Sequence, residues 1–127
     1  MEVVRFDPFD GALGLSLATR VGSLVYTSGM VGVDATTLAA PEDLEAEIRL
    51  AFSNLSGILE SMGTSFDHVL EQTNFLVGDP EVVYPVFQKV RTEVFAGRLP
   101  ASTSVFVQAL VSPEFHCEVK LVAAAPD

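Results

Sequence analysis

The sequence contains little that could form a disulfide or bind a metal. Its single cysteine, Cys117, excludes an internal disulfide and a cysteine-based zinc site, and this usage is typical of a reducing compartment. The only two histidines, His68 and His116, lack the spacing that places two ligands on one side of a metal. We therefore expect neither a metal nor a cofactor.

Basic residues are also scarce. Seven Lys and Arg stand against 17 Asp and Glu, which gives a formal net charge of −10. Such a charge repels nucleic-acid backbones and anionic membrane surfaces. The N-terminal residues contain no charged-then-apolar leader, and no apolar run approaches the length of a membrane span. These absences predict a cytoplasmic protein that binds neither nucleic acid nor membrane.

No repeat, low-complexity tract or linker interrupts the sequence, so residues 1–127 are expected to form a single domain. Apolar residues make up 49% of the chain and charged residues 19%, a composition that favours a folded core over disorder. A chain of this size still exposes roughly a third of the surface of its unfolded form. Association with further copies would bury more of that surface.

Apolar residues between positions 43 and 62 recur every three or four residues, which predicts a long amphipathic helix. Pro41 lies at its entrance, and acidic residues that include Glu47 suit the positive end of its dipole. A second helix is expected to begin between Glu81 and Pro85, because proline is tolerated in a first turn and breaks a later one. Its buried stripe would consist of Val83, Val86, Phe87, Val90 and Val94.

Segments with strand composition precede, separate and follow these helices. They comprise residues 3–6, 15–20, 24–29, 69–77, 103–111 and 115–124. Both helices are long enough to serve as crossovers that cover one face of a single sheet. The predicted fold is therefore α/β (α+β), with two helices on one face of a mixed sheet and a partner subunit on the other.

The last of these strands carries a row of polar side chains. His116, Glu118 and Lys120 lie on one side of it, opposite Cys117 and Val119. Cys117 is expected to be a small buried apolar residue rather than a reactive thiolate. The polar row has two interpretations. It is either the solvated side of a strand with a cross-strand ion pair, or part of a functional site.

Several short motifs follow one another along the chain. They are Leu24-Val25-Tyr26-Thr27-Ser28-Gly29-Met30-Val31-Gly32, Ala51-Phe52-Ser53-Asn54-Leu55 with Ile58-Leu59 and Gly63, residues 73–77, Pro100-Ala101 and Glu118-Val119-Lys120. In order and spacing they resemble the RidA/YjgF/L-PSP family over nearly the whole chain. The resemblance implies a chorismate-mutase-like fold, assembled as a homotrimeric barrel with small-metabolite clefts at the subunit interfaces. For the best-known members it also implies hydrolysis of enamines and imines such as 2-aminoacrylate to a keto acid and ammonia.

The chain departs from the family pattern at the position that binds the substrate carboxylate. The family's P-A-R-S motif has an arginine there, whereas this chain has Ser102 after Pro100-Ala101, which is similar to the YjgH-like branch. Leu15 stands where an aromatic hydroxyl residue is expected, while Gly29 and Glu118 match. Truncating one member of a buried charge pair costs about 2–5 kcal/mol. Standard 2-aminoacrylate deaminase activity is therefore expected to be weak or absent.

Three other arginines are candidates to replace the missing one. Arg98 lies on the same loop, and Arg20 or Arg91 would arrive from a neighbouring subunit. No pattern in the sequence distinguishes among them.

Three functional hypotheses remain open at this point. The first is a trimeric deaminase or hydrolase of C=N bonds, in which Glu118 is the general acid/base and Gly29, Ser102 and Ser104 shape the pocket. The second is a non-catalytic trimer that senses a metabolite or acts as a chaperone. The third, an endoribonuclease or translation inhibitor, is the least favoured because basic patches are absent.

Overall fold

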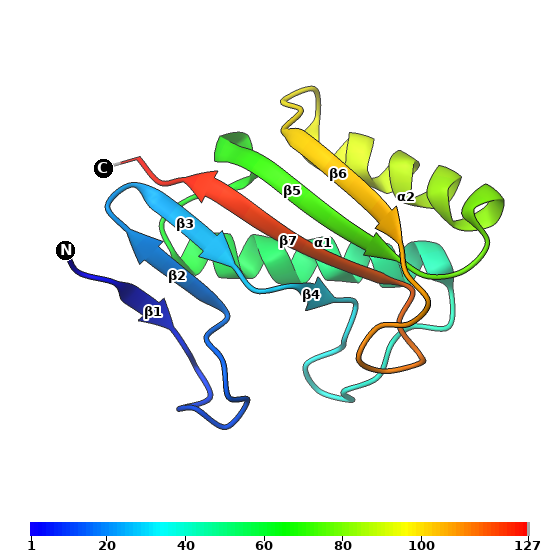
Figure 1. The fold of residues 1–127 in the computed structure, drawn as a ribbon, viewed down its shortest axis with the longest axis horizontal. Coiled ribbons are helices and arrows are strands. Elements are labelled where there is room, and N and C mark those ends of the chain that lie inside the picture. The colour runs from blue at the N-terminus through cyan, green and yellow to red at the C-terminus, as the bar shows by residue number, and fades with distance from the viewer. Residues whose placement is uncertain (127) are drawn as a thin grey trace.

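The computed structural model describes residues 1–126, which form one sheet of seven strands with two helices packed on one face (Figure 1). The strands are β1 (Val4–Phe6), β2 (Ala18–Val21), β3 (Leu24–Thr27), β4 (Met30–Val31), β5 (Val69–Leu76), β6 (Ala101–Phe106) and β7 (Cys117–Ala124). The strand order is β1-β2-β3-β7-β5-β6, and β4 also pairs with β7. Only β5 and β6 run parallel to each other. The predicted mixed sheet with both helices on one face is confirmed.

Helix α1 (Leu44–Ser61) matches the predicted amphipathic helix, with Asp43 and Met62 as its caps. The side chain of Asp43 accepts a hydrogen bond from the backbone N–H of Ala46 at 2.9 Å, which satisfies one of the free donors of the first turn.

Helix α2 (Pro80–Phe95) begins one residue before the predicted range. Asp79 is its N-cap and accepts a hydrogen bond from the N–H of Glu81 at 2.9 Å, so Pro80 occupies the first helical position, where a missing N–H is harmless. Pro85 therefore lies within the helix, which continues past it. The short 3-10 helix η1 (Phe66–His68) leads into β5.

The predicted strand 103–111 was wrong at both ends. Strand β6 starts at Ala101 and ends at Phe106, because its partner β5 ends at Leu76 and leaves nothing further to pair with. The predicted strand 15–20 likewise shortens to β2, whose residues are the ones that face β1 and β3. The predicted strand 24–29 ends at Thr27 as β3, and the short strand β4, which follows Ser28 and Gly29, was not predicted.

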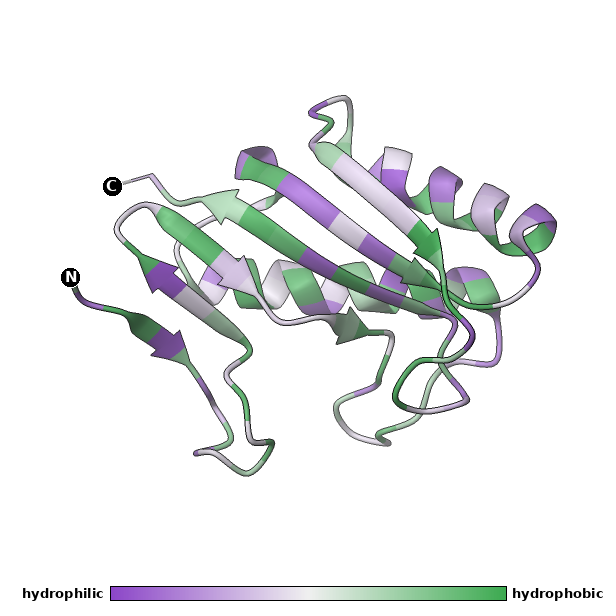
Figure 2. Ribbon diagram, viewed as in Figure 1, coloured by the Kyte–Doolittle hydropathy of each residue, from purple (hydrophilic) through white to green (hydrophobic). Residues whose placement is uncertain are grey.

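The core lies between the sheet and the two helices. Hydrophobic and hydrophilic residues alternate along the first half of β7 (Figure 2), and its hydrophobic ones point toward the helices. Cys117 is fully buried, and burial raises the pKa of its thiol. The nearby carboxylates of Glu47 and Glu118 raise this pKa further. The buried residues that the helices contribute include Ile48, Phe52, Leu55, Leu59, Val83, Phe87, Val90 and Phe95. In the predicted stripe of α2, Val86 and Val94 are only partly buried, and Phe95 is buried in addition.

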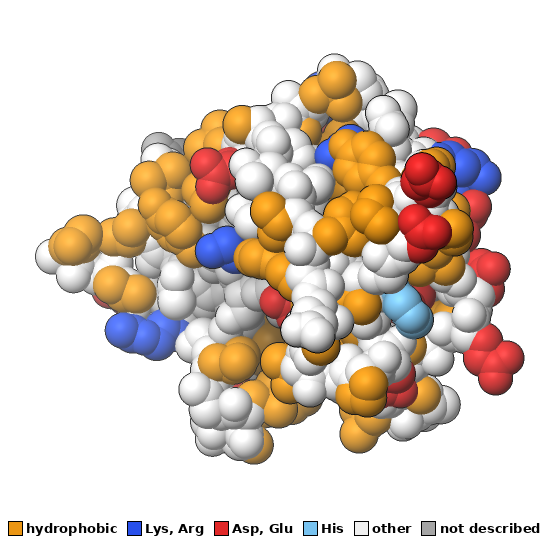
Figure 3. All heavy atoms as spheres, turned by 45° about the vertical axis from the view of Figure 1, so that its right-hand side comes forward, with side chains coloured by type: hydrophobic (Ala, Val, Ile, Leu, Met, Phe, Trp, Pro, Cys, Tyr) orange, Lys and Arg blue, Asp and Glu red, His pale blue; other side chains and the backbone are white. Residues whose placement is uncertain are grey.

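The opposite face of the sheet has no helix over it. Leu24, Tyr26 and Val105 lie on it and expose 36%, 45% and 40% of their surfaces. We call this face the open face. Seen from one side, hydrophobic side chains occupy much of the middle of the surface, while acidic ones gather toward the right-hand edge (Figure 3). Within residues 1–126, no helix has the length and apolar character that crossing a bilayer requires.

Glu47 lies in the first turn of α1, where an acidic residue suits the helix dipole, but its side chain is buried rather than exposed. Its residue is 1% exposed, and its carboxylate accepts the backbone N–H of His116 at 2.6 Å and contacts the Nδ1 of the same residue at 2.9 Å. Two hydrogen bonds therefore connect α1 to the segment that leads into β7.

We expect Glu47→Ala to lower the free energy of unfolding by about 2–4 kcal/mol, because the N–H of His116 loses a charged acceptor. Chemical denaturation of both proteins measures this change. Glu45→Ala is the control, since Glu45 makes only exposed ion pairs with Arg49 and Lys89, which contribute at most about 1 kcal/mol. Equal losses in the two variants would contradict a special role for Glu47.

Candidate functional site

Register partners in a sheet project their side chains from the same face. Glu118 on β7 is paired with Phe75 on β5, whereas Val119 is paired with Asn74, which in turn is paired with Ser104 on β6. Val119 and Asn74 are fully buried on the helix side. Glu118 therefore lies on the open face, and Ser104 lies on the face that the helices cover.

Glu118 is half-buried at the edge of a cavity of about 360 Å³. Apart from Glu118, the walls are apolar and consist of Phe75, Val107, Ala109, Leu110 and Val111. Among residues 1–126, no Lys, Arg or His side chain forms an ion pair with this carboxylate. The oxygens of this carboxylate are therefore not engaged by a cation of the described residues.

Gly29 lies against the side chain of Glu118. A β-carbon at position 29 would stand 2.5 Å from Oε2 of Glu118 and 2.8 Å from its Cδ, which is too close for any real contact. The segment is fixed on its other side, because the hydroxyl of Ser28 donates to the carbonyl of Ser16 at 2.6 Å. The missing side chain at Gly29 therefore leaves the space that the carboxylate occupies.

The strand that follows Gly29 is held against α1. The side-chain amide of Asn54 donates to the carbonyls of Val31 and Val33 at 3.1 and 3.0 Å. Between them, Gly32 packs against the backbone carbonyl of Glu47 so closely that no β-carbon fits. Helix α1 thus sets the position of β4, and β4 in turn pairs with Glu118 through Val31.

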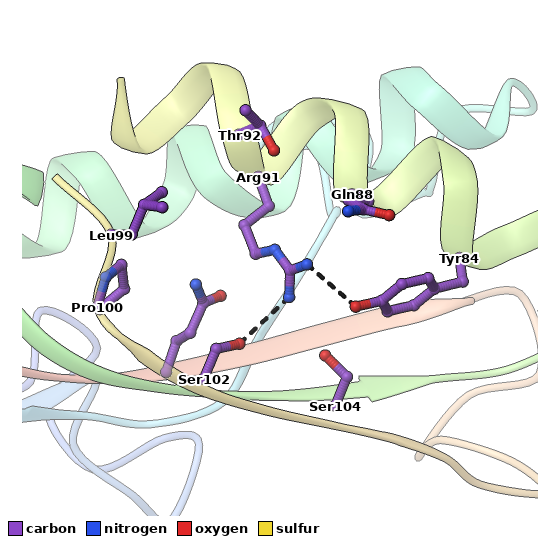
Figure 4. A pocket seen from close by; sticks show the side chains of 9 residues that line it. Tyr84, Gln88, Arg91, Thr92, Leu99, Pro100, Ser102 and Ser104 are labelled. Carbon is purple, nitrogen blue, oxygen red and sulfur yellow. Dashed lines mark hydrogen bonds between the residues drawn. The ribbon is translucent and has the colours of Figure 1, made fainter. Parts of the chain in front are cut away.

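A second cavity, of about 580 Å³, lies between α2 and β6 (Figure 4). Its lining consists of Gln72, Tyr84, Gln88, Arg91, Thr92, Leu99, Pro100, Ser102 and Ser104. Ser102 and Ser104 therefore lie together, and on the opposite side of the sheet from Glu118 and Gly29. Within one chain, the four predicted site residues therefore form two separate pairs, Glu118 with Gly29 and Ser102 with Ser104.

Arg91 projects from α2 into this second cavity and contacts Ser102 (Figure 4). Its Nη1 donates to the hydroxyl of Ser102 at 3.2 Å, and its Nη2 donates to the hydroxyl of Tyr84 at 3.1 Å. The guanidinium also lies 5.6 Å from the ring centre of Tyr84 and 5.2 Å from that of Phe87. Two hydroxyls and two aromatic rings thus hold one cation beside Ser102.

Two buried amide side chains lie beneath the serines. Asn74 donates to the hydroxyls of Ser102 and Ser104 at 3.1 and 3.0 Å, while its own Oδ1 has no hydrogen-bond partner in the described part of the chain. The Oε1 of Gln72 also has no partner within residues 1–126, although Gln72 is only 1% exposed. An unpaired buried acceptor is costly, so Gln72 offers the cavity a strong acceptor.

The other two candidate arginines are engaged elsewhere. Arg20 donates to the carbonyls of Gly22 and Met62, which closes the C-terminal end of α1. Arg98 forms an exposed ion pair with Asp67 at 2.9 Å. Only Arg91 lies next to Ser102, and it comes from the same chain rather than from a neighbouring subunit.

The cross-strand ion pair considered for the polar row does not form within residues 1–126. His116 precedes β7 and contacts Glu47 on α1, and Lys120 is exposed on the open face two residues from Glu118. The predicted row of three is therefore reduced to Glu118 and Lys120, because the ring of His116 contacts α1 instead.

Sequence reasoning missed Tyr84, Gln72 and Asn74, and it considered Arg91 only as a residue from a neighbouring subunit. Tyr84 and Arg91 are seven residues apart and so share one face of a helix, and Gln72 and Asn74 take alternate positions of a strand whose other buried residues are apolar. Both signals are visible in the sequence once the elements are known. Within residues 1–126, no group of three or more His, Cys, Asp and Glu side chains is arranged to hold a metal.

Comparison with known proteins gives one family. Residues 9–125 match the family described as Endoribonuclease L-PSP. The chain is 35% identical over 113 residues to the RutC family protein YjgH of Escherichia coli K12, an alignment that covers 88% of this chain and 83% of that protein. It is 28% identical over 102 residues to the 2-iminobutanoate/2-iminopropanoate deaminase of Salmonella typhimurium, with 71% and 80% covered.

Solved structures give the same result. Protein YjgH superposes with a TM-score of 0.83 at 30% identity, covering all of this chain and 97% of that one. A member of the YjgF protein family from Neisseria meningitidis superposes with a TM-score of 0.84 at 26% identity, covering all of this chain and 98% of the other.

We expect Gly29→Ala to move the carboxylate of Glu118 at little cost to stability. The clash is with the free end of a flexible side chain, so the cost is that of a strained rotamer, at most about 1.5 kcal/mol. The side-chain carboxyl ¹³C shift of Glu118, followed by NMR, should change.

Gly32→Ala and Gly57→Ala are the comparison variants. Gly32→Ala clashes with backbone and should destabilise more than Gly29→Ala, whereas Gly57 has open space around its Cα, so its replacement should leave the shift of Glu118 unchanged. An unaltered Glu118 signal in Gly29→Ala would contradict the proposed packing.

Proposed function

This chain belongs to the endoribonuclease L-PSP family, the RidA/YjgF/L-PSP family that its motifs predicted, and on that premise we propose that it hydrolyses the C=N bond of small imino acids. The observation that carries the proposal is the position of Glu118. Its carboxylate lies at an apolar cavity, beside the space that Gly29 leaves and without a cationic partner among residues 1–126. A glutamate in this environment suits a general acid/base.

The reaction needs few groups from the protein. Water adds to the carbon of the protonated C=N group while Glu118 takes a proton from the water, which gives a carbinolamine. Glu118 then returns that proton to the nitrogen. As the C–N bond breaks, Glu118 takes up the hydroxyl proton, which leaves a 2-keto acid and ammonia, and the ammonia then accepts that proton and departs as ammonium. The sum is one protonated imine and one water giving one keto acid and one ammonium ion. No atom changes its oxidation state, so no oxidant or reductant is required.

The relatives support this chemistry. One, from Salmonella typhimurium, carries the name 2-iminobutanoate/2-iminopropanoate deaminase. The replacement of the family's arginine by Ser102 is the feature that favours an altered substrate range for this chain.

We further propose that the site is completed between copies in a homotrimer. Glu118 and Gly29 lie on the open face, while Ser102 and Ser104 lie at β6, the outermost strand of the sheet on that side. If the β6 edge of one copy docks on the open face of the next, the two pairs of residues meet. Such a head-to-tail contact uses different surfaces on the two copies, and with a rotation of a third of a turn it closes into a ring of three. It would also cover the exposed apolar side chains of the open face.

The two alternatives are separable from this proposal by experiment. Saturable binding of a keto acid with no release of ammonia would favour a ligand-sensing or chaperone-like trimer. Binding of RNA that survives physiological salt would favour an endoribonuclease. Charge argues against the latter, because four of the seven basic side chains are already bonded to carboxylates or carbonyls: Arg20, Arg49, Lys89 and Arg98.

We expect Glu118→Gln to reduce kcat/KM for ammonia release from 2-iminobutanoate, generated in situ, by about a hundredfold or more, because an amide cannot take up the proton. Glu71→Gln is the matched control, since Glu71 is an exposed carboxylate on the neighbouring strand β5. A Glu118→Gln variant as fast as the parent would remove Glu118 from the reaction.

Light scattering should give three times the mass of one chain. We expect Val105→Glu, which places a charge on the open face, to yield monomers, because a carboxylate buried at an interface without a partner is strongly unfavourable. Val82→Glu is the control, as Val82 is 59% exposed on α2. A monomeric parent protein would exclude a site shared between copies.

A further inference from the structure

Arg91 differs from the other engaged cations of the chain in the groups that it contacts. Arg49, Lys89 and Arg98 each form an ion pair with a carboxylate, and Arg20 closes the end of a helix. Arg91 contacts only hydroxyls and aromatic rings, and no carboxylate within residues 1–126 lies within 4.0 Å of it. Its charge is therefore not neutralised by the protein, although acidic residues outnumber basic ones by 17 to seven.

The lining of the cavity is selective for an anion. Of the nine side chains that surround it, Arg91 is the only charged one, and the remainder are hydroxyls, amides and two apolar residues. A guanidinium has five N–H donors, and two of the donor directions of Arg91 are used by Ser102 and Tyr84. The donors that remain are available to a carboxylate, which guanidinium groups bind in a bidentate geometry.

A second feature points to a ligand independently of the charge. Gln72 lines the same cavity and is 1% exposed, and its Oε1 has no hydrogen-bond partner among residues 1–126. That oxygen can accept only from a donor, so the ligand that satisfies the cavity carries an N–H or O–H group in addition to its negative charge. A small 2-imino acid has both, with a carboxylate next to a C=N–H group.

We propose that Arg91 binds the carboxylate of the substrate and has taken over from helix α2 the role of the arginine that Ser102 replaces. The proposal rests on the proposed function for the identity of the ligand. Because the guanidinium already stands 3.2 Å from Oγ of Ser102, an arginine at position 102 would bring two like charges into the same space. The two arginines are therefore mutually exclusive in this cavity, and the cation is relocated rather than lost.

Calorimetric titration with pyruvate, the keto acid that hydrolysis of 2-iminopropanoate releases, tests the proposal. We expect Arg91→Gln to weaken pyruvate binding about thirtyfold or more, the effect of truncating one member of a buried charge pair. Binding of methyl pyruvate, which lacks the charge, should be equally weak to the parent and to the variant. Arg49→Gln, which removes a cation from the surface of α1, is the control and should bind pyruvate as the parent does.

Two further variants keep the test decisive. Arg91→Lys keeps the positive charge but lacks the planar guanidinium, so it should bind pyruvate about tenfold more weakly than the parent. It also provides a second test if the Arg91→Gln variant does not fold. The double variant Arg91→Gln/Ser102→Arg moves the cation onto β6 and should recover most of the lost affinity. Pyruvate binding within threefold of the parent in both Arg91 variants would overturn the proposal, as would an equal loss of affinity for methyl pyruvate.

Ammonia release separates this proposal from the proposed function. Pyruvate binding that depends on Arg91, with no turnover of imino acids by the parent protein, would leave the role of Arg91 standing and remove the hydrolysis. Turnover of imino acids that is unchanged in Arg91→Gln would remove the role of Arg91 and leave the hydrolysis standing.

Discussion

The alternation of side chains along β7 determines which residues enter the core and which, including Glu118, lie on the open face. Because β7 pairs with β3, β4 and β5, its register is fixed on both sides. Cys117, Val119 and Leu121 enter the core, so Glu118 must face the other way. A slip of one residue would bury the carboxylate and expose the valine, so hydrophobic burial itself positions Glu118. Gly29 has no β-carbon and therefore leaves the space that the carboxylate of Glu118 occupies.

The same constraint divides the candidate site. Residues on the two faces of one sheet cannot meet around a small molecule, and the pair Glu118 and Gly29 is separated from the pair Ser102 and Ser104 in this way. Within residues 1–126, no strand pairs with the outer edge of β6 and no helix covers the open face. A contact between copies that joins these surfaces would bury apolar side chains and complete the site at once. Stability and function would then depend on one interface.

Much of the fold could be predicted from the sequence, because α1 and β5 have clear periodicities and because the motif order identifies the family. The end of β6 could not, since it depends on where the partner strand stops rather than on the composition of residues 107–111. The burial of Glu47 was missed for a related reason, as its acceptor role requires His116, which is distant in sequence. Arg91 was considered only as a residue from another subunit, because the sequence does not tell which face of α2 lies over Ser102.

Mixing of inactive subunits tests the shared site most directly. Glu118→Gln and Arg91→Gln trimers are each expected to be impaired, and each would be unfolded, mixed in equal amounts and refolded together. If Glu118 of one copy acts with Arg91 of the next, every mixed trimer contains one intact site, and random mixing restores about a quarter of the parent's ammonia release. If both residues serve a site within one chain, no mixed trimer contains an intact site, and the absence of any recovery would contradict the account.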